Sequence, residues 1–407
     1  MKIVRLTTLY PSYIDYFYNR NPNIESEPFH IQQSRLHYDG FGWADFWTHS
    51  MRPLGYDVCN IEVNVKPLQI AWARENDISF INKSWLRDIV IAQIQKFRPE
   101  IVFIQTESLL AKKWLIKVIR GLPSLKFLIA WVGSPIRKIY HFSECDFVLT
   151  CIPEKIEKFK KVGIPCYHLN HAFDPRILER INLEEDKRYD ITFIGQILRT
   201  SRFHFGRDRI LNKLIDDLDL MIFSPSTQLP FSTFLKYYMK KGIHNAARIS
   251  RLDRLQDRTL QRFFTDEIAR VIKEAPLSPV NRRLIPYLKP PVFGLDMYQT
   301  LRNSKITLNT HIDVSPKSAS NMRLFESTGV GTCLLTDWKE NLTDIFEPEK
   351  EVVTYRSPAE CIEKARWLLD HPAERRAIAE AGHYRTLTDH TFAQRAQQFD
   401  DFVKKSL

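Results

Sequence analysis

A polar loop followed by a short predicted helix holds the residues best suited to bind a phosphorylated ligand. The tetrapeptide SASN precedes a predicted helix over 322–328, with Ser320 or Asn321 as the expected N-cap. The free N–H groups at such a helix start attract a phosphate, and Arg323 can add a bidentate contact to it. Glu326 lies one turn further along the same helical face, where its carboxylate can accept hydrogen bonds from ribose hydroxyls. The segment predicts a nucleotide site, although Arg323 and Glu326 could equally form a solvated surface pair.

These residues must be positioned by the elements around them, and the first part of the chain alternates strands and helices. Short runs rich in Val, Ile, Leu and Phe predict strands over 3–9, 56–65, 101–105, 127–132, 147–151 and 166–169. Helical patterns separate most of them, over 85–97, 109–119 and 154–162. Such alternation predicts a parallel sheet that is buried on both faces.

A second alternating set follows a charged segment at 170–188. Its strands are predicted over 189–195, 218–224, 305–310, 331–337 and 351–355. Its helices are predicted over 207–217, 295–303, 322–328, 358–369 and 374–385. We therefore expect an α/β protein with two Rossmann-like domains, over 1–175 and 176–388, that face each other across a cleft. The carboxyl ends of the strands should line this cleft.

The second domain contains an insertion at about 225–290 that breaks the alternation. Within it, arginines recur every three or four residues, which on a single helix would place them along one face beside apolar residues. These are Arg248, Arg251, Arg254, Arg258 and Arg262. The face could be simply solvated, could contact the anionic head groups of a membrane or of a lipid-pyrophosphate acceptor, or could bind nucleic acid.

Composition narrows the class of protein. The 407 residues carry a net charge of +11, with 44% hydrophobic and 26% charged residues, which is typical of a globular protein with polyanionic partners. No run approaches the ~18 apolar residues of a membrane span, and no secretory signal begins the sequence. The six cysteines form no C-x-x-C motif, which argues against a zinc site or a disulfide framework. We expect a cytoplasmic protein, with a possible peripheral position at the inner face of the membrane.

The run NMRLFESTGVGTCLLTD (321–337), with LRNSKITLNTH before it, resembles the C-terminal half of GT-B glycosyltransferases. It is most similar to the spore-maturation-type (CgeB-like) group and to the group 1 glycosyl transferases. The run YDITFIGQI, in which Gly195 ends the first strand of the nucleotide domain, and the tail at 347–399 look like the same group. The likeness covers about 189–224 and 290–400. By this resemblance, a final helix over 389–407 should cross back onto the first domain.

The resemblance implies a nucleoside-diphosphate sugar donor held by the second domain. In related enzymes a Glu at the position of Glu326 binds the donor ribose, and the neighbourhood of Asn321 and Arg323 meets the diphosphate. Many retaining relatives have a second acidic residue eight positions earlier, near the donor sugar, but Ser318 stands there. The stereochemical outcome is therefore open.

Sugar transfer places negative charge on the departing nucleoside diphosphate, which cationic groups must stabilise. Candidates besides Arg323 and the helix start are Arg199 and Lys317. His311, directly after a strand, either contacts a donor phosphate or bonds a loop carbonyl. These groups could replace a divalent metal, so we expect metal independence and no cofactor.

An inverting reaction also needs a base for the acceptor hydroxyl. The aromatic run HYDGFGWADFWTHS (37–50) offers carboxylates beside rings that suit a carbohydrate. We expect Asp39 to be the base, with Asp15 and Glu107 as further candidates. Alternatively, Asp39 or Asp45 caps a helix and the rings pack in the core.

The resulting expectation is a metal-independent glycosyltransferase that moves a hexosyl or related group to a glycan, lipid-linked or small-molecule acceptor. A nucleotide-sugar epimerase of GT-B fold is one alternative, but Ser318 in place of a carboxylate counts against it. A non-catalytic nucleotide- or glycan-binding protein is another alternative. A nucleic-acid partner would rest on net charge alone, so none is expected.

Overall fold

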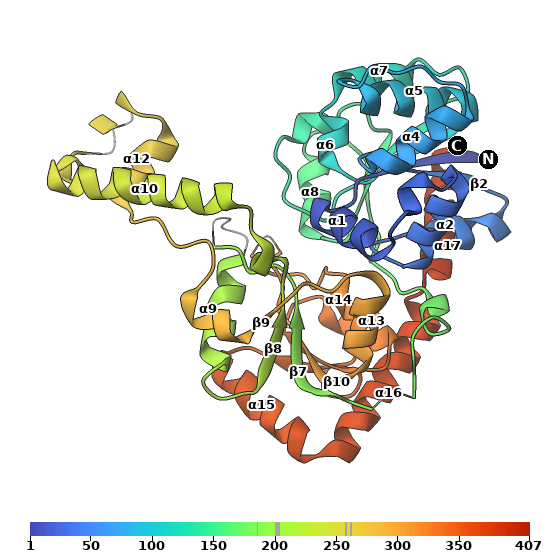
Figure 1. Cartoon of the computed structure of the whole chain (residues 1–407). Helices are drawn as coiled ribbons and strands as arrows, with labels where there is room; N and C mark the ends of the chain where they lie inside the picture. Colours follow the sequence, from blue (N-terminus) through green and yellow to red (C-terminus); the bar gives the residue numbers. More distant parts are fainter. Residues whose placement is uncertain (185, 200–203, 257–258, 261–262, 314) are drawn as a thin grey trace.

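The computed structural model describes residues 1–184, 186–199, 204–256, 259–260, 263–313 and 315–407. Two α/β domains face each other, and a helical pair projects from the second one (Figure 1). Each domain is built on a six-stranded sheet in which all neighbouring strands are parallel. This is the α/β architecture that the alternating pattern predicted.

The first sheet has the order β2-β1-β3-β4-β5-β6. Its strands are β1 (Lys2–Thr7), β2 (Asp57–Glu62), β3 (Ile101–Ile104), β4 (Phe127–Trp131), β5 (Phe147–Thr150) and β6 (Cys166–His168). The interior strands β3, β4 and β5 are completely buried, as continuous apolar runs covered by helices should be.

The helices of the first domain connect and cover these strands. They are α1 (Pro11–Arg20), α2 (Phe29–Tyr38), α3 (Phe46–Met51), α4 (Lys66–Glu75), α5 (Trp85–Phe97), α6 (Glu107–Leu110), α7 (Lys113–Arg120) and α8 (Glu154–Lys160). The single helix predicted over 109–119 is wrong: Lys112 has an extended backbone and separates α6 from α7. Burial of Leu109 and Leu110 on one side of this break and of Leu115 on the other anchors both pieces in one apolar cluster.

The second sheet has the order β12-β11-β10-β7-β8-β9. Its strands are β7 (Tyr189–Ile194), β8 (Leu220–Phe223), β9 (Leu288–Lys289), β10 (Ser304–Asn309), β11 (Cys333–Asp337) and β12 (Val353–Tyr355). Around it lie α9 (Phe205–Leu214), α13 (Gly294–Arg302), α14 (Arg323–Gly329), α15 (Pro358–Asp370) and α16 (Pro372–Asp389). The edge strand β9 has only two residues and was not predicted.

Short 3-10 turns complete the described elements. They are η1 (Ile24–Ser26), η2 (Arg52–Leu54), η3 (Ile139–Phe142), η4 (Pro175–Ile177), η6 (Pro225–Gln228), η7 (Leu252–Arg254), η8 (Arg282–Tyr287) and η9 (Leu342–Asp344).

The insertion differs from the single arginine-lined helix that the sequence predicted. Its main helix α10 (Phe231–Ile249) ends before most of the arginines, and α12 (Asp266–Lys273) packs against it. The Ser250 hydroxyl donates a hydrogen bond to the Ala246 carbonyl at 2.8 Å, and Arg251 then adopts a left-handed backbone with φ 58°. That conformation stops a right-handed helix.

The predicted arginine face is therefore wrong in its geometry. Arg248 belongs to α10, Arg251 lies in the turn after it, and Arg254 lies in η7. Arg258 and Arg262 lie outside the described residues.

The last helix, α17 (Phe392–Ser406), packs on the first domain, and the chain ends beside its own N-terminus (Figure 1). Phe399 packs against the rings of both Trp47 and Phe103, with centroid distances of 5.7 and 5.5 Å. The Tyr56 hydroxyl donates to the Asp400 carboxylate at 2.7 Å. One apolar cluster consequently runs from the first domain through α17 into the second.

Candidate functional site

The buried His311 and the partly exposed Asp337 form a pair at the carboxyl ends of neighbouring strands. Because β10 and β11 are parallel, with Asn309 opposite Thr336, the residues that follow them emerge side by side. His311 Nδ1 lies 2.7 Å from Asp337 Oδ1, and the His311 backbone N–H donates to the same oxygen at 2.9 Å.

The electrostatics of this pair keep Asp337 ionised. Burial by itself would raise the pKa of Asp337, but His311, together with Lys339 at 3.1 Å, lowers it to about 2. The other imidazole nitrogen, His311 Nε2, is buried and has no hydrogen-bond partner among the described residues, while the whole side chain is nearly inaccessible. Asp337 therefore orients the ring, and Nε2 stays available for a ligand.

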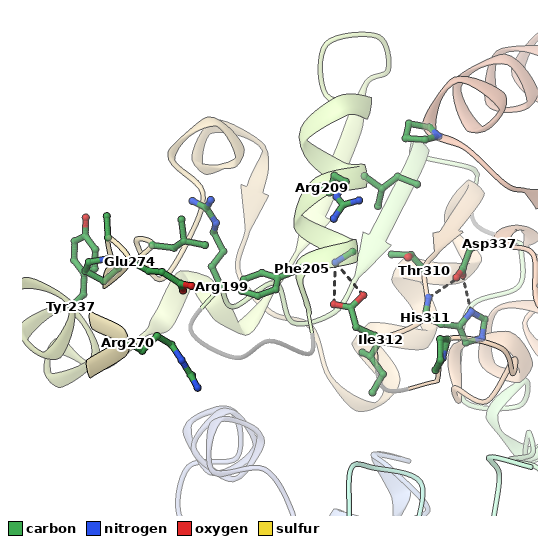
Figure 2. Close-up of a pocket in the computed structure, with 18 of the residues that line it drawn as sticks. Arg199, Phe205, Arg209, Tyr237, Arg270, Glu274, Thr310, His311, Ile312 and Asp337 are labelled. Carbon is green, nitrogen blue, oxygen red and sulfur yellow. Dashed lines mark hydrogen bonds and ion pairs between the residues drawn. The ribbon is translucent and has the colours of Figure 1, made fainter. Parts of the chain in front are cut away.

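A pocket of about 1510 Å³ opens beside this pair, between the second sheet and the insertion (Figure 2). Loops after β7, β10, β11 and β12 supply one side of it, and α10 and α12 supply the other. The cationic lining residues in the described part of the chain are Arg199, Arg209, Lys236, Lys240, Arg270, Lys339 and Arg356. The acidic ones are Glu267, Glu274, Asp313 and Asp337. The excess of cations favours an anionic ligand.

The start of α9 at the pocket rim already holds a carboxylate. The Gly206 backbone N–H lies 3.1 and 3.2 Å from the two Asp313 oxygens (Figure 2). A Cβ at Gly206 would lie 2.5 Å from Asp313 Oδ1, so a residue without a side chain is needed for this approach. Nearby, Arg199 Nε lies 3.2 Å from Asp208 Oδ2. The predicted Arg199 does line the pocket, in an ion pair with α9.

Arg207, in the first turn of α9, was not singled out from the sequence. Its Nε donates to the Thr310 carbonyl at 3.0 Å, and desolvation lowers the pKa of its guanidinium to about 10, with Asp337 opposing and Arg323 adding to that shift. Arg207 therefore lies between the pocket and α14. Its position in the sequence could have identified Arg207, because it is a cation in the first turn of the helix that follows the first strand of the second domain.

Glu326 is buried and Arg323 is mostly covered, so their interpretation as a solvated surface pair is wrong. Arg323 Nη1 lies 2.9 Å from Glu326 Oε2, and Arg323 Nη1 also contacts the Met297 sulfur at 3.1 Å. Burial raises the pKa of Glu326, and Arg323 opposes that shift. Burial therefore favours the neutral form of the Glu326 carboxyl, except where a cation or a hydrogen-bond donor stabilises its charge.

The predicted cap of this helix is also wrong. The N-cap of α14 is Met322, without a side-chain cap. Asn321 is engaged elsewhere, because its Nδ2 donates to Asn309 Oδ1 on β10 at 2.7 Å. Asn321 thus fixes the loop to the sheet instead of capping the helix.

Tyr10, in the first domain, approaches Glu326 and Arg207 of the second domain. It follows β1, and its side chain is 65% exposed. Partial burial and the Glu326 carboxylate raise the pKa of its hydroxyl, whereas Arg207 lowers it. The hydroxyl is therefore within electrostatic range of both residues. Tyr10, Glu326 and Arg207 mark where the two domains approach each other.

A second contact between the domains joins Ser318 to Glu154. The Ser318 hydroxyl donates to Glu154 Oε2 at 2.5 Å, and Glu154 Oε1 is buried with no hydrogen-bond partner among the described residues. Glu154 begins α8, directly after β5, so it lies at the carboxyl edge of the first sheet. The sequence did not single it out, because only the folded chain brings it to Ser318.

Asp39 also reaches the second domain, by a contact that the sequence did not predict. It accepts a hydrogen bond from the Tyr13 hydroxyl at 2.8 Å and approaches the start of α13 so closely that a Cβ on Gly294 would lie 2.0 Å from Asp39 Oδ2. Desolvation raises the pKa of Asp39, while hydrogen bonds from Tyr13 and the Leu295 backbone act in the opposite direction. A raised pKa suits a base, and its catalytic role stays a prediction.

The other carboxylates in question either bind different groups or are exposed to solvent. Glu107 accepts hydrogen bonds from the Arg137 and Lys138 backbones at 2.8 and 2.9 Å, which fixes a loop. Asp45 binds Arg176 through both oxygens, at 3.0 and 3.1 Å. Asp15 is exposed on α1.

Two further predicted residues lie outside the pocket lining. Lys317 is largely exposed and its Nζ lies 3.6 Å from Glu340 Oε1. Gly195 directly follows β7, and its N–H donates to the Phe223 carbonyl at 3.0 Å. Of the predicted donor residues, the pocket lining contains Arg199 and His311, and it contains neither Arg323 nor Glu326.

In the part of the chain that the structure describes, no group of three or more His, Cys, Asp or Glu residues is arranged to hold a metal ion. All six cysteines are free thiols. None of the described helices is long and apolar enough to cross a membrane.

Comparison with known proteins relates this architecture to glycosyltransferases. Residues 258–401 match the family described as glycosyl transferase-like. A glycosyltransferase from Rickettsia africae ESF-5 is 10% identical, with a TM-score of 0.54 over 100% of this chain and 98% of that one. Sucrose-phosphate synthase from Thermosynechococcus elongatus is 9% identical, with a TM-score of 0.51 over 100% and 98% of the two chains.

The structure of HepE from Anabaena in complex with UDP-glucose is 10% identical and has a TM-score of 0.51 over 100% of both chains. No curated protein matches the chain in sequence. The chain has the GT-B fold, as the resemblance predicted, and the glycosyl transferase-like match runs from the insertion through the second domain into α17. The narrower CgeB-like assignment stays a prediction.

Proposed function

We propose that this protein is a glycosyltransferase that moves a sugar from a nucleoside-diphosphate sugar to a carbohydrate or lipid-linked acceptor. The observation that carries the proposal is the cation-rich pocket at the carboxyl ends of the second sheet, with the unpartnered His311 Nε2 beside it. In open α/β sheets this edge is where ligands bind. The UDP-glucose complex of HepE, a protein of the same fold, supports a nucleotide-sugar donor.

The donor diphosphate would lie between the pocket and α14. Arg199 and His311 approach it from the pocket, and Arg207 approaches it from the start of α9. The cations would stabilise the charge that develops as the sugar bond breaks. Because the Arg199 and Arg207 guanidiniums can supply this positive charge themselves, we propose a metal-independent transfer.

The ribose would bind next to Glu326. This buried carboxylate has Arg323 as its ion-pair partner, and Asn321 holds the preceding loop against β10. Ribose hydroxyls that donate to Glu326 would compensate the cost of its burial.

Glu154 would approach the donor sugar from the opposite domain. Related retaining enzymes have an acidic residue at the position of Ser318, and here the Ser318 hydroxyl binds the Glu154 carboxylate instead. The unpartnered Oε1 of Glu154 can accept a hydrogen bond from a sugar hydroxyl. We keep Asp39 as the proposed base for the acceptor proton, since desolvation raises its pKa.

Thermal unfolding with a panel of nucleoside diphosphates tests the donor, because a ligand that binds only the folded state raises the unfolding temperature. We expect one base to give a larger shift than the others, and no shift with any of them would contradict the proposal. Release of nucleoside diphosphate from the matching sugar donor then separates an enzyme from a binding protein. Product that contains the sugar on an acceptor separates a transferase from an epimerase.

A further inference from the structure

The helix α10 has an unusual distribution of apolar side chains. Large hydrophobic residues on it are exposed to solvent instead of packing against the domain. They are Phe231, Phe234, Leu235, Tyr238, Met239, Ile243 and Ile249, with exposed fractions from 37% for Phe234 to 86% for Ile249. We call these seven residues the α10 stripe.

The spacing of the α10 stripe places its members on one side of the helix, since steps of three and four residues return to the same face. The opposite side packs on α12: Ala247 is buried, and His244 Nδ1 lies 2.9 Å from the Val271 carbonyl. Gly242 lies within the stripe, and a Cβ built on it would meet no atom within 4 Å. The apolar face is therefore open, and α10 projects away from both sheets (Figure 1).

The charges of α10 indicate what covers this face. The helix contains no Asp or Glu, and its basic residues are Lys236, Lys240, Lys241 and Arg248. Lys241 and Arg248 are exposed beside the stripe, whereas Lys240 lies 2.7 Å from Glu267 of α12. An apolar face with flanking cations complements a bilayer surface that carries anionic head groups. Two copies of this helix packed face to face would instead bring like charges together.

We propose that α10 docks this protein on an anionic lipid bilayer, with the α10 stripe inserted among the head groups and acyl chains. The docking surface is thus the outward face of α10, not the arginine face that the sequence suggested. No spanning helix is needed, because an interfacial helix lies in the plane of the membrane.

The same helix joins the membrane surface to the donor pocket. Lys236 and Lys240 line the pocket, so docking would hold its cationic wall at the bilayer. In terms of the proposed function, on which this step rests, the acceptor is an amphiphile carried by that membrane, such as a lipid-linked phosphate or glycan.

Vesicle flotation tests the docking directly. The intact protein is mixed with vesicles of phosphatidylcholine alone or with phosphatidylglycerol added, and the floating fraction is measured. The stripe variant is Phe234→Ser/Tyr238→Ser/Met239→Ser, and the charge variant is Lys241→Glu/Arg248→Glu. The matched control, Trp367→Ser/Tyr384→Ser, removes exposed aromatic residues from α15 and α16. Circular dichroism and nucleoside-diphosphate binding are measured for each variant, so that unfolding or loss of the donor site is detected separately.

We expect the wild type and the control to float with the phosphatidylglycerol vesicles, and both α10 variants to bind them at least about ten-fold more weakly. A wild type that does not float, or a folded stripe variant that floats as well as the wild type, would overturn the docking. A wild-type dimer in light scattering that the stripe variant abolishes, without any flotation, would assign the face to a second copy of the chain. Nucleoside-diphosphate binding is independent of these outcomes, so the proposed function stands or fails separately.

Discussion

The hydroxyl of Ser318 in the second domain donates a hydrogen bond of 2.5 Å to Glu154 in the first. The contact places a carboxylate of the first domain beside Ser318, where the loop of the second domain has no acidic residue. Because the second Glu154 oxygen is buried without a partner, the carboxylate has capacity for one more donor. This contact between the two domains therefore also positions a carboxylate at the proposed site.

Glu154→Gln should lower kcat/KM for sugar transfer by about 100-fold or more, with nucleoside-diphosphate affinity unchanged, because the residue would act on the sugar and not on the nucleotide. Steady-state kinetics and calorimetry measure the two quantities. Glu157→Gln is the matched control, as it removes an exposed carboxylate from the same helix. Equal losses in both variants, or full activity of Glu154→Gln, would exclude this role.

Glu326→Gln should weaken nucleoside-diphosphate binding by about 1 kcal/mol or more, since ribose hydroxyls lose a charged acceptor. The same change should lower the unfolding temperature, because it leaves the Arg323 guanidinium without its ion-pair partner in a largely buried site. Calorimetry and thermal unfolding check both results. If Glu326→Gln unfolds earlier yet binds nucleotide normally, Glu326 has a structural role only.

Asp337→Asn should destabilise the protein near neutral pH and progressively less in acid. The folded-state pKa of Asp337 is lowered to about 2 from 3.8, so its ionised form stabilises the fold above pH ~4, and that contribution of about 2 kcal/mol is lost as the pH falls toward 2. Urea unfolding of the wild type and the variant at several pH values measures the difference. A difference that stays constant from pH 7 to pH 3 would contradict the ion-pair explanation.

Gly294→Ala should lower the unfolding temperature, for two reasons. Gly294 has φ +52°, where an alanine is strained, and the added Cβ would overlap Asp39 Oδ2 at 2.0 Å. The change therefore disturbs the contact between Asp39 and the start of α13. Gly242→Ala is the opposite case, because it adds a methyl group to an open helical site and should stabilise α10 by up to about 1 kcal/mol. Differential scanning calorimetry of both variants checks the contrast in sign.

Local pattern was sufficient for most of the fold. The buried strands are continuous apolar runs, so their period and length identified them, and the helix predicted over 85–97 has the bounds that the structure shows for Trp85–Phe97. The helices α1 and α2 were not predicted, because each buries only two side chains, Tyr13 and Phe17 in α1 and Gln32 and Leu36 in α2, which is too few to mark a helical stripe. Arg323 and Glu326 could be selected by their spacing, but their burial could not, since it depends on Met297 and the neighbouring strands.

By itself the sequence determined the two alternating α/β halves, the basic charge and the helix that contains Glu326, because each depends on residues close together in the chain. Only the tertiary structure decided that Glu154 meets Ser318, that Asp39 reaches Gly294, and that His311 is oriented by Asp337. The physical reason is that these pairs are distant in sequence, and they form only when parallel strands bring their carboxyl ends to one edge and the two domains close over it. The open face of α10 belongs to the same category, since exposure depends on what the rest of the chain covers.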